Sequence, residues 1–299
     1  MICLEKRHIL SELFKVEAVG SEKYTLGEGP YYDPRYKRLS WVDIVGRKLL
    51  FLKDGKKESV DLPQQVGAAI PLAGSDGFAL AMEDGIYLYK DGKIDLFLDL
   101  KNVFKDYWRS NDAKADAKGR LWFGASVGDD DHEAEGNLYL YNNGKLDIKV
   151  ADTKISNGMA WSADKKKFFF SDSLKYAVFV YDYDEESGSI SGGKVLFNVE
   201  DGIPDGLTID SEDNLWVAFW GGSRIEKRSG ETGELLKSIP IPAKQVTSCC
   251  FGDEDMKTLY ITTAGIGLEG DLDGFLFKMR TDVEGVKPDY SWFELFCLK

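Results

Sequence analysis

The fold is decided by a repeated unit, whose clearest copy reads Gly202-Ile203-Pro204-Asp205-Gly206-Leu207-Thr208-Ile209-Asp210-Ser211-Glu212-Asp213-Asn214-Leu215-Trp216-Val217-Ala218. A short β-favouring run at 207–209 leads into a polar turn at 210–214, and an apolar run at 215–218 follows. Asp205 precedes the first run, between a proline that fixes φ and a glycine that tolerates most backbone angles. The unit therefore predicts a loop carrying a carboxylate, a strand, a turn and a second strand.

The same pattern of β-run, aspartate turn and apolar β-run recurs along the whole chain. The turn aspartates are Asp33, Asp76, Asp116, Asp164, Asp210 and Asp253, which lie 40 to 48 residues apart. Copies of the unit also carry two further β-runs joined by turns such as Asn-Gly and Asp-Gly, and helical periodicity is nearly absent. Repeats of this length with four strands each are typical of propeller blades. We therefore predict an all-β fold, a six-bladed β-propeller of four-stranded blades.

The two ends of the chain must meet for such a ring to close. Residues 13–19 form a short amphipathic β-run ahead of the first repeat. We expect this run to supply the outer strand of the last blade, beside 274–279. The resulting prediction is one propeller domain over residues 13–290, with an N-terminal leader at 1–12 and a C-terminal tail at 291–299.

Composition narrows the class of protein. The 299 residues carry a net charge of −13, which argues against nucleic acid as a partner because phosphate binding needs a basic face. No run approaches the roughly 18 apolar residues of a membrane helix, and we see no signal peptide. The four cysteines have no zinc-ligand spacing. We expect a cytoplasmic monomer that acts on a small molecule, with neither nucleic acid nor membrane as a partner.

Oxygen-bearing side chains stand just before the innermost strand in four repeats. In a propeller, the loops that enter the inner strands converge on the central channel, so these side chains are expected to meet there. They form a hard-oxygen set suited to Ca²⁺, Mg²⁺ or Mn²⁺, and the two histidines, at 8 and 132, match no such position. The sequence therefore predicts a central divalent-metal site. The side chains are Glu28, Asn111, Asn157 and Asp205.

Each residue also has an ordinary structural interpretation. Asn157-Gly158 and Asp205-Gly206 are common turn sequences, Glu28 suits a surface position between two glycines, and Arg109 suits an ion pair with a nearby acid. The acidic stretch at 128–136 is typical of a solvated loop, with a mobile lid or a second cation site as alternatives. The functional interpretation is favoured because these residues stand at equivalent positions in different copies of the repeat.

At this point the motifs resemble a known family. Gly-Glu-Gly-Pro at 27–30, Arg-Ser-Asn-Asp at 109–112, Ser-Asn-Gly at 156–158 and Ile-Pro-Asp-Gly at 203–206 are similar to motifs of the regucalcin/gluconolactonase/luciferin-regenerating enzyme family. The resemblance runs from about residue 20 to residue 288. It implies a six-bladed propeller with one divalent cation at the mouth of the channel.

The resemblance also implies roles for single residues. Glu28, Asn157 and Asp205 match the metal ligands of the family, and Arg109 and Asn111 match its substrate-contacting pair. The implied cofactor is one divalent cation. Ca²⁺ is the first candidate, and Zn²⁺, Mn²⁺ and Mg²⁺ are the alternatives. The sequence departs from the family in the short acidic loop after Gly124 and in the loop at 265–273, and both loops are expected to border the substrate pocket.

The implied activity is that of a metal-dependent lactonase, which hydrolyses sugar lactones of the gluconolactone type to aldonic acids. In this hypothesis the cation polarises the lactone carbonyl and Asp205 activates the attacking water. Related hydrolysis of esters or organophosphates, or a non-enzymatic role as a calcium-binding regulatory protein, are the alternatives. The residues suggested as pocket walls are Tyr31, Met159, Trp161 and Trp220.

Overall fold

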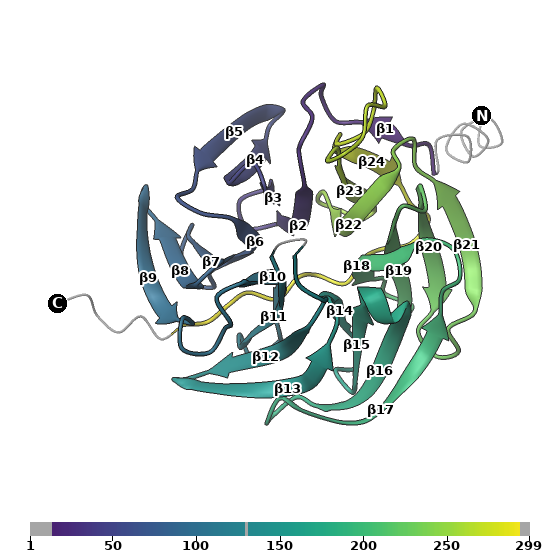
Figure 1. The fold of residues 1–299 in the computed structure, drawn as a ribbon. Helices are drawn as coiled ribbons and strands as arrows, with labels where there is room; N and C mark the ends of the chain where they lie inside the picture. Colours follow the sequence, from purple (N-terminus) through teal and green to yellow (C-terminus); the bar gives the residue numbers. More distant parts are fainter. Residues whose placement is uncertain (1–13, 129–130, 294–299) are drawn as a thin grey trace, which may run out of the picture.

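The computed structural model describes residues 14–128 and 131–293, which form a ring of six four-stranded antiparallel sheets (Figure 1). Blade 1 contains β2 (Gly27–Asp33), β3 (Arg38–Asp43), β4 (Lys48–Lys53) and β5 (Lys56–Asp61). Blade 2 contains β6 (Val66–Pro71), β7 (Phe78–Met82), β8 (Gly85–Lys90) and β9 (Lys93–Asp99). Blade 3 contains β10 (Trp108–Ala115), β11 (Leu121–Val127), β12 (Gly136–Asn142) and β13 (Lys145–Thr153).

The second half of the ring repeats this order. Blade 4 contains β14 (Ser156–Trp161), β15 (Lys167–Asp172), β16 (Ala177–Asp184) and β17 (Ser189–Asn198), with the 3₁₀ helix η1 (Ser173–Lys175) after β15. Blade 5 contains β18 (Ile203–Ile209), β19 (Asn214–Trp220), β20 (Arg224–Ser229) and β21 (Leu235–Pro240). Blade 6 contains β22 (Gln245–Gly252), β23 (Thr258–Ala264), β24 (Phe277–Arg280) and β1 (Glu17–Ala18). The predicted six-bladed all-β propeller is confirmed.

The ring closes through blade 6, whose outermost strand comes from the start of the described chain. Glu17 lies opposite Lys278 in the β1–β24 ladder, and the Phe14 amide donates to the Arg280 carbonyl at 2.8 Å. The predicted use of 13–19 as the outer strand of the last blade is confirmed for the described residues. The proposed leader at 1–12 lies outside them, as do residues 294–299 of the proposed tail.

Burial falls from the inner to the outer strands. The inner strands β6 and β14 are buried at every residue, whereas the outer strand β5 has only exposed and partly buried residues. The second strands carry the largest buried side chains, including Trp41, Trp122 and Trp216. These rings pack between neighbouring blades, where their apolar surface is removed from water.

Two of the recurring aspartates, Asp116 and Asp210, hold the turn between the first and second strands of their blades. In blade 5, Asp210 Oδ1 accepts hydrogen bonds from the Glu212 and Asn214 amides at 3.0 and 2.9 Å. Its Oδ2 accepts the Trp216 indole N–H at 3.0 Å. Asp116 accepts the indole of Trp122 in the same way at 2.9 Å. At these two positions the aspartate is therefore a structural tie between a turn and a core tryptophan.

Each inner strand carries a bulge near its start. The register with the second strand shifts between Glu28 and Tyr31 in blade 1, between Ser156 and Met159 in blade 4, and at the equivalent place in the other four blades. A bulge re-aims the side chains of its extra residue. At Gly158 a Cβ would come within 2.7 Å of the Asp205 carbonyl oxygen, so glycine allows β14 and β18 to approach each other.

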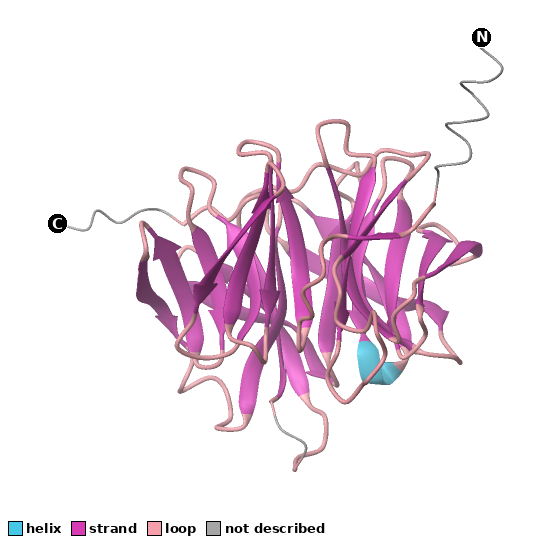
Figure 2. Cartoon of the chain, turned by 90° about the horizontal axis from the view of Figure 1, so that it is seen from above, coloured by secondary structure: helices cyan, strands magenta, loops and turns pink. Residues whose placement is uncertain are grey.

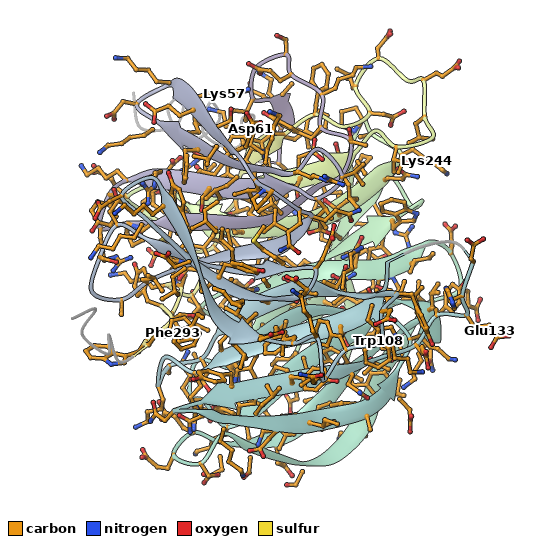
Figure 3. The ribbon with its side chains drawn as sticks, turned by 60° about the vertical axis from the view of Figure 1, so that its left-hand side comes forward. Lys57, Asp61, Trp108, Glu133, Lys244 and Phe293 are labelled. Carbon is orange, nitrogen blue, oxygen red and sulfur yellow. The ribbon has the colours of Figure 1, made fainter. Side chains whose placement is uncertain are left out.

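The described residues after β24 cross the end of the ring opposite these bulges. The Gly285 amide donates to the Met256 carbonyl of blade 6 at 2.8 Å, and the Trp292 amide donates to the Gly119 carbonyl of blade 3 at 2.8 Å. Figure 3 shows Glu133 and Lys244 on one side of the ring and Phe293 on the other. Among the described residues, no helix is long and apolar enough to cross a membrane.

Candidate functional site

Four of the predicted side chains meet at one end of the channel, beside η1, which lies at the lower edge of the ring in Figure 2. Asn157 Nδ2 donates to Ser173 Oγ of η1 at 3.1 Å and makes a short hydrogen bond to Asp205 Oδ1. Asn111 Nδ2 donates to the Ser156 carbonyl at 3.0 Å. Together these contacts join the inner strands of blades 3, 4 and 5 at their bulges.

Glu28 completes this cluster from blade 1. It is only 7% exposed, and its Oε2 accepts the Gly29 amide at 2.8 Å. Burial, together with the charge of Asp112, raises the pKa of Glu28 to about 8. Burial and the charges of Glu28 and Asp112 likewise raise the pKa of Asp205 well above its ordinary value. The cluster thus gathers carboxylates that disfavour each other's ionisation.

One oxygen of the cluster has no hydrogen-bond donor. Asn157 is 5% exposed, and its Oδ1 is buried without a partner. Such an orphaned acceptor costs about 1–3 kcal/mol unless a cation or a donor satisfies it. Together with Glu28 and Asp205 it makes a set of two carboxylates and one amide oxygen, which suits Ca²⁺, Mg²⁺ or Mn²⁺.

The amide is essential to this donor set. In residues 14–128 and 131–293, no group of three or more His, Cys, Asp and Glu side chains could hold a metal ion. A metal centre at the bulges therefore depends on Asn157 as well as on the two acids. The residues present fit a hard divalent cation and offer neither the imidazole nor the thiolate ligands that zinc usually takes.

Arg109 lies at the rim of this site. Its Nη1 donates to the Ser110 carbonyl at 2.9 Å and to Asn111 Oδ1 at 2.8 Å. Burial lowers the pKa of its guanidinium, while the charges of Glu28 and Asp205 act in the opposite sense. Arg109 and Asn111 thus form one unit that presents donors beside the acidic cluster, as a substrate-contacting pair requires.

Sequence reasoning did not assign a role to two residues that hold the site together. Ser173 accepts from Asn157 and donates to the Pro204 carbonyl at 2.8 Å. Lys114 Nζ donates to the carbonyls of Met159 and Leu207 at 2.7 and 2.8 Å, within the channel. The signal for Lys114 was available, because it is a charged residue in the interior of an inner strand. No sequence pattern marked Ser173, which begins the short helix η1.

Three of the four residues suggested as pocket walls line a different cavity. Tyr31, Met159 and Trp161 line a small cavity of about 70 Å³ at the opposite end of the channel, beneath residues 286–289. This cavity is separate from the candidate metal centre, because Tyr31 and Trp161 follow their site residues by three and four positions and a strand advances about 3.3 Å per residue. Trp220 ends β19 and is half-buried.

The acidic loop is tied down at its end. Glu135 Oε1 accepts the Tyr107 hydroxyl at 2.7 Å and the Trp108 indole at 3.3 Å, and it pairs with Lys105. The His132 ring stacks on Tyr107 with centroids 3.7 Å apart. The described part of this loop therefore borders the channel mouth through contacts to residues just before Arg109, and residues 129–130 lie outside the description.

Comparison with known proteins gives a consistent result. Residues 26–265 match the family described as SMP-30/gluconolactonase/LRE-like region. The chain is 36% identical over 277 residues to a Bacillus subtilis protein that carries the provisional name sugar lactone lactonase YvrE, covering 88% of this chain and 94% of that one. A luciferin-regenerating enzyme structure matches with a TM-score of 0.87 and 34% identity, over 93% of this chain and 99% of the other. A calcium-binding protein, regucalcin, from Agrobacterium tumefaciens matches with a TM-score of 0.85 and 25% identity, over 93% and 97%.

Proposed function

Because the chain belongs to the SMP-30/gluconolactonase/LRE-like family, we propose that it is a metal-dependent lactonase that hydrolyses sugar lactones to aldonic acids. The observation that carries the proposal is the orphaned Asn157 Oδ1 beside the buried acids Glu28 and Asp205. A purely structural cluster gains nothing from an unpaired buried oxygen. A bound cation would satisfy this oxygen.

Glu28, Asn157 and Asp205 would hold the cation. When bound, it would supply positive charge that stabilises the negative charge developing on the lactone carbonyl oxygen. Calcium is the first candidate because all three donors are oxygens and because a relative of the same fold is a calcium-binding protein. Zn²⁺, Mn²⁺ and Mg²⁺ are the alternatives that a metal series would separate.

Asp205 is our candidate for accepting the proton of the attacking water. Its carboxylate is buried at the channel end, and burial with neighbouring acids raises its pKa, which makes it a stronger base than an exposed aspartate. A bound cation would act in the opposite sense on both Asp205 and the water. Arg109 and Asn111 would orient the hydroxyl groups of the sugar from the rim.

The decisive experiment compares Asp205→Ala with the parent on glucono-δ-lactone, in Ca²⁺, Mn²⁺, Mg²⁺ or Zn²⁺. We expect kcat to fall by at least 100-fold, in line with the loss of a general base, and EDTA to abolish turnover of the parent. Asp95→Asn, on the exposed strand β9, is the matched control. Activity of Asp205→Ala within a few-fold of the parent would remove Asp205 from the mechanism.

A calcium-binding regulatory role is the second candidate, because the same donor set would serve it and a relative carries that description. It predicts calcium affinity without turnover of any lactone. Hydrolysis of esters or organophosphates by the same site is the third, and a substrate panel separates it from lactone opening.

A further inference from the structure

A polar groove opens beside the candidate metal centre, between blades 2 and 3. Its lining includes Gln65, Glu83 and Asp84 of blade 2 and residues 104–109 before and within β10. We propose that this groove is a subsite for an uncharged sugar ring attached to the lactone, so that the preferred substrates are glycosyl-aldonolactones rather than monosaccharide lactones. The inference rests on the proposed function and adds the substrate class. It is carried by the size, the charge balance and the aromatic wall of the groove.

The groove is continuous with the site through one residue. It encloses about 530 Å³, within the range of pockets that hold drug-sized ligands. Arg109 lines it and also contacts Asn111 of the site. A lactone ring held at the rim by this pair would direct one substituent along the groove, and a single sugar ring would leave most of the volume to water.

Charge in the groove is balanced. Lys101 pairs with Asp84 at 3.1 Å, and Lys105 pairs with Glu135. Asp84 Oδ1 also accepts the Tyr87 hydroxyl at 2.7 Å. A phosphate or carboxylate group would have to displace one of these acids to reach an ammonium group, since anion recognition favours uncompensated cations. At Arg109 it would meet the negative charges of Glu28, Glu83 and Asp205, which already act on that guanidinium. The lining therefore favours an uncharged, hydroxylated ligand.

One wall of the groove is aromatic and fixed in place. Tyr107 and Trp108 line it, and both donate to the same carboxylate oxygen, Oε1 of Glu135. Trp108 also packs against Phe104 with ring centroids 6.2 Å apart. Side chains held in this way lose little further freedom when a ligand binds. An apolar ring surface beside polar groups such as Gln65 and Glu83 matches the alternating apolar and hydroxyl faces of a sugar.

The kinetic test compares glucono-δ-lactone with cellobiono-δ-lactone, 6-phosphogluconolactone and dihydrocoumarin at a fixed metal concentration. We expect kcat/KM for cellobionolactone to exceed that for gluconolactone by about 10-fold, equivalent to about 1.4 kcal/mol, mainly through a lower KM. In Trp108→Ala this ratio should fall toward one. A preference for the phosphorylated or the aryl lactone would overturn the proposal, as would an unchanged ratio in the variant.

A binding measurement tests the sugar subsite independently of lactone hydrolysis. Calorimetry with cellobiose should show binding to the parent protein in Ca²⁺ and a loss of at least 5-fold in affinity in Trp108→Ala, whereas Trp108→Phe should retain most of it. If no lactone is hydrolysed but cellobiose binds in this pattern, the proposed function fails and the subsite stands. If gluconolactone is hydrolysed but cellobiose binding does not depend on Trp108, the subsite is refuted and the lactonase stands.

Discussion

Replacing Glu28 with glutamine should change how the stability of the protein depends on pH. Glu28 is 7% exposed, and its burial raises its pKa from 4.5 to about 8. In the unfolded chain the same carboxyl ionises near its ordinary value. Between these two pKa values the folded protein therefore holds a proton that the unfolded chain has released. The contribution of this proton to the free energy of unfolding is fully present below pH 4.5 and is lost as the pH rises toward 8.

The size of the effect follows from the two pKa values. From pH 5.5 to pH 7.5 in EDTA, one retained proton lowers the free energy of unfolding by about 2.5 kcal/mol. Glu28→Gln is uncharged at every pH and has the shape of the protonated acid, so it should lack this slope. The variant minus parent difference in Tm should grow by about 5 °C over that range, taking about 2 °C per kcal/mol for a chain of this size.

Thermal melts at four pH values, with EDTA or with Ca²⁺, provide the assay. Saturating Ca²⁺ should stabilise the parent more than Glu28→Gln at pH 7.5, because the ion replaces the proton on the carboxylate. Glu58→Gln, on the exposed strand β5, is the matched control and should follow the parent. A variant minus parent difference that stays constant from pH 5.5 to 7.5 in EDTA would refute the reasoning.

Three further predictions test other parts of the structure. Asn157→Ala should weaken Ca²⁺ binding by at least 10-fold in calorimetry, since it removes the orphaned oxygen; unchanged affinity would contradict the donor set. Lys114→Met should lower the free energy of urea unfolding by about 2–4 kcal/mol, because it leaves the carbonyls of Met159 and Leu207 without their donor; a stability equal to the parent would show that water replaces the ammonium. Deleting residues 288–299 should lower Tm by several degrees and make Cys250, which lines the cavity beneath, reactive toward a thiol reagent; an unreactive Cys250 would show that other residues close that end.

The architecture was predictable because it depends on local signals that repeat. In blades 1, 3, 4 and 5 the turn aspartate accepts backbone amides two to four residues ahead, so the signal and its cause lie in one short segment. Repetition at a fixed interval then gave the number of blades. The closing strand was predictable for a different reason. In a ring of six blades, the last blade lacks an outer strand, and residues 13–19 can supply it.

The residues of the candidate site were predictable, but the distance of neighbouring side chains from the channel end was not. Glycines mark the bulges that bring Glu28, Asn157 and Asp205 to one end of the channel, and these were visible as Gly-Glu-Gly, Asn-Gly and Asp-Gly. How far a side chain lies from that end depends on its position along the strand, and Tyr31 and Trp161 line a separate cavity further along. Contacts between segments far apart in the chain, such as Asn157 with Ser173, left no pattern to find.

The last residues of the described chain touch every blade of the ring at the end opposite the site. They contact blades 6 and 5 at Met256 and Ile209, blades 4 and 1 at Lys165 and Tyr31, and blades 2 and 3 at Pro71 and Gly119. Blade 6 itself combines the earliest described strand with three of the last to be synthesised. During translation, the ring therefore cannot close until β24 has left the ribosome, and residues 17–18 remain without their strand partner until some 260 further residues have been made.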